Sequence, residues 1–176
     1  MHGARTAEIV FTDGIVRREN RLGEEGKGGK VGRESREGGR SGIGGESLGI
    51  AEGAMEEAMA YTKGRVQFGK PISKFQNTQF TFADMYMGCE AGRLLTYQAA
   101  MLKGEGKRFT KEAAMAKLFC SEHAMKTTTK ALQMFGGYGY TKDYPLERMM
   151  RDAKITEIYE GTSEIQRVVI SGNIGL

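Results

Sequence analysis

Apolar and small residues recur at helical spacing over most of the chain from residue 48 onward. The first series predicts an amphipathic helix that ends near Gly64, because side chains three and four residues apart share one helix face. Its members are Leu48, Ala51, Met55, Ala58 and Thr62. One face of this helix is therefore expected to pack against other helices.

A second series predicts a long helix after Pro71. Ser73 and Gln76 match the S-x-x-Q capping box, so this helix is expected to begin at Ser73. Its apolar seam repeats in alternating steps of three and four, which suits packing of helix against helix. The seam consists of Phe75, Thr78, Phe82, Met85 and Cys89.

A third long helix is predicted after the segment "KGEGKR", with Thr110 as its N-cap. The segment "FGGYGY" ends it, a short helix follows Pro145, and a last helix begins at Thr162 or Ser163. Helices with one apolar face each must bury those faces against one another. The sequence therefore predicts a mainly α fold, an antiparallel bundle of the four-helix type, and short connections disfavour an extended coiled coil.

The first 47 residues have a different composition. Residues 7–18 alternate apolar and polar side chains around an Asp-Gly turn, which predicts two short strands. Two strands alone are marginal in water, so they are expected to join a larger sheet outside this chain or to pack on the helices. Residues 23–47 are rich in glycine, arginine and glutamate, which is typical of a flexible, charged segment.

Composition restricts the classes of function. The 176 residues are 39% hydrophobic and 27% charged, which suits a globular domain with a sizeable core. The net charge of +4 comes without a tract of basic and aromatic residues, so no nucleic-acid partner is expected. No apolar run has the length of a membrane span or the character of a signal peptide, so the expected setting is soluble and intracellular.

Cysteine and histidine usage predicts no metal site. Cys89 and Cys120 lack CxxC spacing and fall on predicted apolar helix faces, so buried free thiols are favoured over a disulfide or a ligand pair. His2 and His123 belong to no cluster of metal ligands.

Four stretches carry more specific information, namely "GRVQFGKPISKFQ", "QMFGGYGY", "YPLERMMRDAKI" and "IYEGTSEIQR". Together and in this order they resemble the C-terminal helical domain of the acyl-CoA dehydrogenases, most closely the short-chain or butyryl-CoA type. The resemblance covers nearly the whole chain and about the latter half of a family member. It implies that residues 1–22 are a remnant of the central β domain and that residues 48–176 form the helical domain. For residues 23–47 the resemblance offers an alternative to a flexible segment, namely a degraded start of the first helix.

The resemblance implies FAD-dependent oxidation of a short-chain acyl-CoA to the trans-2-enoyl-CoA, with electrons passed to an electron-transferring flavoprotein. Glu160 matches the catalytic base in the family's Tyr-Glu-Gly-Thr motif, and Gly161 would allow the tight turn. Without the motif, Glu160 could equally be a solvated loop charge or a charge at a helix N-terminus. A base of this kind works best with a raised pKa in a desolvated site.

Several cofactor contacts are implied by matching positions. Arg65 would pair with the FAD pyrophosphate, Phe68 would pack on the adenine end, and Gln76 would hydrogen-bond the cofactor or act in its capping box. The remaining expected contacts are Gln133, Gly136, Gly137, Thr162 and Glu164. Simpler structural interpretations exist for several of these positions: a helix C-terminal cation for Arg65, a core aromatic for Phe68, a glycine helix stop for Gly136 and Gly137, and a capping box of Ser163 with Gln166.

Substrate contacts are implied for Glu37, Arg40, Tyr159 and Gly161. Around Arg36 the sequence departs from the family, because charged residues and glycine stand where apolar residues are expected. The family's flavin is shared between subunits, so a homo-oligomer (dimer or tetramer) is implied. The resemblance also implies a location in the bacterial cytoplasm, which is preferred over the mitochondrial matrix. Two other interpretations stay open: a non-catalytic helical oligomerisation module, and a companion subunit for a chain that carries the other domains.

Overall fold

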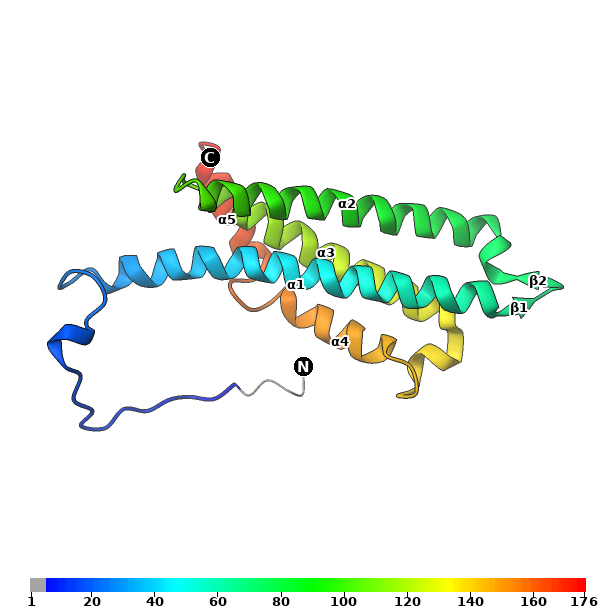
Figure 1. The fold of residues 1–176 in the computed structure, drawn as a ribbon, viewed down its shortest axis with the longest axis horizontal. Helices are drawn as coiled ribbons and strands as arrows, with labels where there is room; N and C mark the ends of the chain where they lie inside the picture. Colours follow the sequence, from blue (N-terminus) through cyan, green and yellow to red (C-terminus); the bar gives the residue numbers. More distant parts are fainter. Residues whose placement is uncertain (1–5) are drawn as a thin grey trace.

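Three long helices lie side by side in the computed structural model, which describes residues 6–176 (Figure 1). They are α1 (Gly28–Gly64), α2 (Gln76–Gly104) and α3 (Thr110–Phe135), and successive helices run in opposite directions. Two shorter helices follow, α4 (Leu146–Thr156) and α5 (Ser163–Asn173). The predicted mainly α, antiparallel bundle is confirmed.

Short elements connect the helices. A two-residue hairpin joins α1 to α2, with β1 (Val66–Gln67) antiparallel to β2 (Lys70–Pro71). The 3-10 turns are η1 (Arg18–Asn20), η2 (Ile72–Lys74) and η3 (Gly136–Tyr140). None of the helices within residues 6–176 combines the length and the apolar character that crossing a bilayer requires.

Helix α3 occupies the centre of the bundle and contacts α1, α2, α4 and α5. Its buried face consists largely of alanine, which has no side chain beyond Cβ and so lets the neighbouring helices approach closely. Larger side chains fill the space near the end of α1. The core cluster there consists of Ala54, Met55, Ala58, Met85, Ala131, Phe135 and Leu146.

Residues 28–47 belong to α1, so the helix begins twenty residues before Leu48. Of the two expectations for this segment, the structure agrees with the start of a helix and not with a flexible linker. The reason is tertiary packing: a Cβ on Gly44 would lie 3.4 Å from the backbone of Ala116 on α3. A close neighbouring helix offsets the low helix propensity of glycine.

Two predicted N-caps are wrong. Helix α2 begins at Gln76 after Phe75, and no side chain caps it, so Ser73 and Gln76 form no capping box. Thr110 is the first residue of α3 and does not cap it. Its hydroxyl instead donates a hydrogen bond to the Glu37 carboxylate at 2.9 Å, a long-range partner that local sequence rules do not anticipate.

The two strands predicted within residues 7–18 are not formed. This segment is extended or bent, and its apolar side chains face solvent; the exposed fraction is 85% for Phe11 and 96% for Ile15. No further sheet lies beside it within residues 6–176, and the segment does not pack on the helices. Residues 1–5, which include His2, lie outside the described residues.

Candidate functional site

The turn between α4 and α5 carries Glu160 in an unusual backbone conformation. Its φ is 55°, in the left-handed region, and Gly161 follows with φ 97°. Such a conformation costs a residue other than glycine about 1–3 kcal/mol, so the surrounding contacts must maintain it. The turn brings the carboxylate against α1, where a Cβ on Gly39 would lie 2.9 Å from Glu160 Oε2.

Gln166 reaches back from α5 to this turn. Its side-chain Nε2 donates to the backbone oxygens of Glu160 at 3.2 Å and of Gly161 at 2.8 Å. Thr162 is the N-cap of α5 and accepts from the backbone N–H of Ile165 at 3.4 Å. The alternative capping box of Ser163 with Gln166 is therefore wrong, because the buried Gln166 side chain serves the turn instead.

Tyr159 attaches the same turn to α1. Its hydroxyl donates to Glu46 Oε2 at 2.9 Å, across 113 residues of sequence. Burial and then the neighbouring Glu46 carboxylate raise the pKa of the Tyr159 phenol above its usual range, so the phenol stays a donor. Just beyond the turn, the pKa of the Glu164 carboxyl is lowered by its own backbone N–H and by the Thr162 hydroxyl.

A cleft of about 430 Å³ lies among α1, the start of α3 and α5. It contains Arg36, Glu37, Arg40 and Thr110, with Val168 on the α5 side. The Arg40 Nε is buried without a hydrogen-bond partner among residues 6–176. Gly39, against which the Glu160 carboxylate lies, directly precedes Arg40, so the turn and the cleft contact the same turn of α1 from different directions. The predicted substrate residues Glu37 and Arg40 line the cleft, whereas Tyr159 and Gly161 belong to the Glu160 turn and do not line it.

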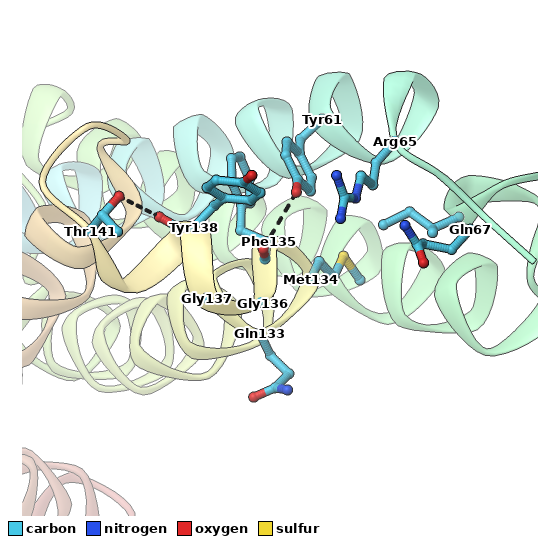
Figure 2. A pocket seen from close by; sticks show the side chains of 11 residues that line it. Tyr61, Arg65, Gln67, Gln133, Met134, Phe135, Gly136, Gly137, Tyr138 and Thr141 are labelled. Atoms are coloured by element: carbon cyan, nitrogen blue, oxygen red, sulfur yellow. Dashed lines mark hydrogen bonds between the residues drawn. The ribbon is translucent and has the colours of Figure 1, made fainter.

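A second cavity, of about 490 Å³, lies at the other end of α1 (Figure 2). Tyr61 stacks on Phe135 with ring centroids 4.0 Å apart, and the Arg65 guanidinium carbon lies 5.7 Å from the Tyr138 ring centroid. Figure 2 shows the Gln133 side chain pointing away from these rings.

Four of the predicted cofactor residues line this second cavity, namely Arg65, Gln133, Gly136 and Gly137. Phe68 and Gln76 do not line it. Phe68 lies in the hairpin with φ 51° and 92% exposure, so its alternative interpretation as a core aromatic is wrong. Gln76 is exposed at the start of α2.

Thr162 and Glu164 belong to the Glu160 turn, so the predicted cofactor residues fall into two groups. Arg65 stands 26 positions after Gly39, on which the Glu160 carboxylate lies. At 1.5 Å per helical residue, the two groups are about 39 Å apart along α1.

Sequence reasoning missed Lys117, a wholly buried residue of α3. Its Nζ has no hydrogen-bond partner among residues 6–176. The pKa of Lys117 is lowered to about 8, mainly by burial and also by Arg40, while the carboxylates of Glu157, Glu164 and Glu122 oppose this shift. Its position on the alanine-rich face of "AAMAK" was the available signal. The aromatic Tyr61 and Tyr138, and the positioning contacts of Glu46 and Gln166, were also missed.

Comparison with known proteins places the chain in a family. The family model described as acyl-CoA dehydrogenase, C-terminal domain, matches residues 26–175. The short-chain specific acyl-CoA dehydrogenase of Clostridium acetobutylicum is 56% identical over 174 residues, which cover 99% of this chain and 46% of that protein.

Solved structures agree with this match. Butyryl-CoA dehydrogenase from Megasphaera elsdenii aligns with a TM-score of 0.92 at 55% identity, over 94% of this chain and 43% of that one. A chain in the structure of the electron-transferring flavoprotein of Acidaminococcus fermentans matches with the same TM-score of 0.92 and identity of 55%, over 94% of this chain and 44% of that one. The chain thus spans less than half the length of these relatives. It belongs to the acyl-CoA dehydrogenase family and corresponds to the C-terminal helical domain.

Proposed function

We propose that the chain is the C-terminal portion of an FAD-dependent dehydrogenase that converts a short-chain acyl-CoA to the trans-2-enoyl-CoA, with Glu160 as the base. The observation that carries this proposal is the strained turn that holds the Glu160 carboxylate against Gly39 of α1. Among residues 6–176 no ion pair engages this carboxylate. A surface charge alone would not require a left-handed backbone.

In this reaction Glu160 removes a proton from Cα of the thioester. FAD, when bound, would supply the acceptor for the hydride that leaves Cβ as the Cα–Cβ double bond forms. Tyr159 and Gly161 define the path of the turn, and Arg40 and Glu37 would line the approach of the acyl-CoA. Thr162 and Glu164, at the start of α5, would lie beside the flavin.

The cavity at the end of α1 suits the ADP part of FAD. The Arg65 guanidinium offers several fixed donors to a pyrophosphate. A Cβ added to Gly136 or Gly137 would meet nothing within 4 Å, so a ligand can approach the backbone there. The Gln133 amide adds a polar group, and the exposed Phe68 and Gln76 would contact the same cofactor from the hairpin side.

The separation of about 39 Å between Glu160 and this cavity exceeds the reach of one dinucleotide. Each flavin would therefore use the base of one chain and the ADP contacts of a second copy, which makes a homo-oligomer necessary. An exposed apolar stripe on α2 supports self-association. It repeats every seven residues and consists of Phe80, Met87, Leu94 and Met101, which are 61%, 67%, 70% and 65% exposed.

The physiological setting follows from the relatives. We assign an electron-transferring flavoprotein as the electron acceptor and the bacterial cytoplasm as the compartment, because the matched proteins of Clostridium acetobutylicum and Acidaminococcus fermentans are bacterial. Residues 1–22 would form part of the central β domain. One observation favours a companion role as a second candidate: Ile9, Phe11 and Ile15 expose apolar side chains that a sheet of another chain could cover.

The proposal is tested by flavin spectroscopy of the purified chain with FAD, before and after butyryl-CoA. The parent is expected to bind FAD and to bleach with substrate. Glu160→Gln should bind FAD equally and bleach at least about a hundredfold more slowly, since a general base contributes about that much or more. Glu56→Gln, on an exposed part of α1, is the matched control.

Bleaching of the Glu160→Gln variant at the parental rate would exclude Glu160 as the base. If the chain takes up no FAD alone, the cofactor proposal for the isolated chain is wrong. Co-purification of a second polypeptide that restores flavin binding would then establish the companion role.

A further inference from the structure

The Gln166 carboxamide holds two successive carbonyl groups of the turn that carries Glu160. One nitrogen, Nε2, donates both to Glu160 O at 3.2 Å and to Gly161 O at 2.8 Å. The first carbonyl belongs to the peptide that links Glu160 to Gly161, and the second to the peptide that links Gly161 to Thr162; both Glu160 and Gly161 have positive φ. We infer that Gln166 is a positioning residue that fixes the direction of the Glu160 carboxylate, an inference that rests on the proposed role of Glu160 as the base.

The turn needs an external restraint because of its backbone conformation. Glu160 at φ 55° lies in a region that side-chain-bearing residues avoid. Without the two hydrogen bonds, Glu160 would relax toward the favoured regions of φ and ψ. Its side chain would then swing away from Gly39 of α1.

The absence of a side chain at Gly161 leaves room for the Gln166 carboxamide. A Cβ at Gly161 would lie 2.9 Å from Gln166 Nε2 and 3.2 Å from Ile165 Cγ2. Any larger residue would push the carboxamide off the two carbonyls, in addition to the strain of φ 97°. Gly161 therefore serves both the bend of the chain and the approach of Gln166.

The oxygen of the Gln166 carboxamide, Oε1, supports the same role. Gln166 is wholly buried, and its Oε1 has no hydrogen-bond partner among residues 6–176. A rotated amide would direct this oxygen at two carbonyl oxygens and repel them, so the donor orientation is the one the chemistry allows. A buried oxygen without a partner costs stability. Glutamine at this position is thus poorly explained by global stability and well explained by control of the turn.

Other contacts near the turn do not replace Gln166. Thr162 orders the first N–H groups of α5 through Ile165, and Tyr159 attaches the upstream residue to Glu46. Neither contact reaches the carbonyls of Glu160 and Gly161. Loss of the Gln166 donor should therefore loosen the turn while the bundle stays folded.

The test compares Gln166→Met and Gln166→Glu with the control Gln98→Met, which alters an exposed glutamine of α2. The backbone N–H of Ser163 closes the turn by donating to Glu157 O at 3.0 Å. Its hydrogen exchange, read by NMR, is expected to be about tenfold faster in both Gln166 variants and unchanged in the control. In Gln166→Glu the exchange, corrected with the control at each pH, should slow again as the pH falls, because a protonated carboxyl can donate. A merely space-filling role would give no such recovery.

In the flavin-loaded protein, Gln166→Met should bleach at least about tenfold more slowly while the half-saturating concentration of butyryl-CoA stays within about twofold. A parental exchange rate at Ser163 in both variants would overturn the inference, and so would a loosened turn with an unchanged bleaching rate. If the variants loosen the turn but the parent itself never bleaches, Gln166 restrains the turn and the role of Glu160 as base is what fails.

Discussion

The two halves of α1 are one continuous helix with opposite kinds of sequence. Residues 28–47 carry most of its glycines, whereas residues 48–64 carry the regular apolar series. The second half places Met55 in the main core cluster with Phe135 and Leu146. The first half instead places its backbone and polar side chains against the Glu160 turn and α3.

The glycines of the first half lower its helix propensity, but at Gly39 and Gly44 they allow the Glu160 turn and α3 to approach the helix closely. A Cβ on Gly39 would lie 2.9 Å from Glu160 Oε2, and one on Gly44 would lie 3.4 Å from the backbone of Ala116. Glu46 accepts from Tyr159, and Glu37 accepts from Thr110. The first half is therefore held by contacts to distant residues, and the second half by apolar burial.

The largest effect is expected for Met55→Ala in the second half. Met55 is 7% exposed within the core cluster, and such truncations cost about 2–5 kcal/mol of unfolding free energy. Ile43→Ala, at a half-buried site of the first half, should cost only about 1 kcal/mol. Urea unfolding measures both, and an equal cost would show that the first half also depends on apolar burial.

The next effect concerns Lys117, which lies under the first half near Arg40 and Gly44. A buried ammonium with its pKa lowered from 10.5 to about 8 destabilises the folded state at neutral pH. Lys117→Met should therefore raise the unfolding free energy by up to about 3 kcal/mol at pH 7. Chemical denaturation of parent and variant measures this gain.

The pH dependence has a defined sign. Between pH 8 and 10.5 the folded parent releases the Lys117 proton before the unfolded chain does, so the parent gains stability relative to Lys117→Met as the pH rises. Burial raises the pKa of Cys89 to about 11, which removes stability in an overlapping range. Cys89 is present in both proteins, so its contribution cancels when the unfolding free energy of Lys117→Met is subtracted from that of the parent. If the subtracted value does not change with pH, the prediction is contradicted.

A smaller effect, on the site alone, is expected for Gly39→Ala. The added methyl group would displace the Glu160 carboxylate, which can move only by rotating away from its place against α1. Flavin bleaching by butyryl-CoA should slow by about tenfold, which corresponds to about 1.4 kcal/mol in the activation free energy. The helix itself should not be destabilised, and circular dichroism provides that control.

The sequence predicted the helices of residues 48–176 because their apolar faces repeat at helical spacing. Over residues 28–47 the composition favoured a flexible segment and only the family resemblance offered a helix, because the stability of this helix comes from α3 and the Glu160 turn. Four residues named from the motif resemblance, Arg65, Gln133, Gly136 and Gly137, line one cavity in the structure. Gln166 and Lys117 were missed because their environments are made by residues distant in sequence, which no local pattern records.

The smallest effect is expected at glycines that make no close contact, where a substitution changes only the helix propensity. Gly42 is exposed, and an added Cβ would meet nothing within 4 Å; Gly49 in the second half has the same surroundings. Gly42→Ala and Gly49→Ala should each raise the unfolding free energy by about 1 kcal/mol, because alanine loses less backbone entropy in a helix.

Urea unfolding of these two variants compares the halves at sites without contacts. Equal gains would show that both halves are fully helical in the native state and differ only in their contacts. A gain at Gly49 with none at Gly42 would mean that the first half opens locally before the bundle unfolds. The contacts of Glu46 and Glu37 would then be insufficient to hold it, and the Glu160 turn would be exposed to the same opening.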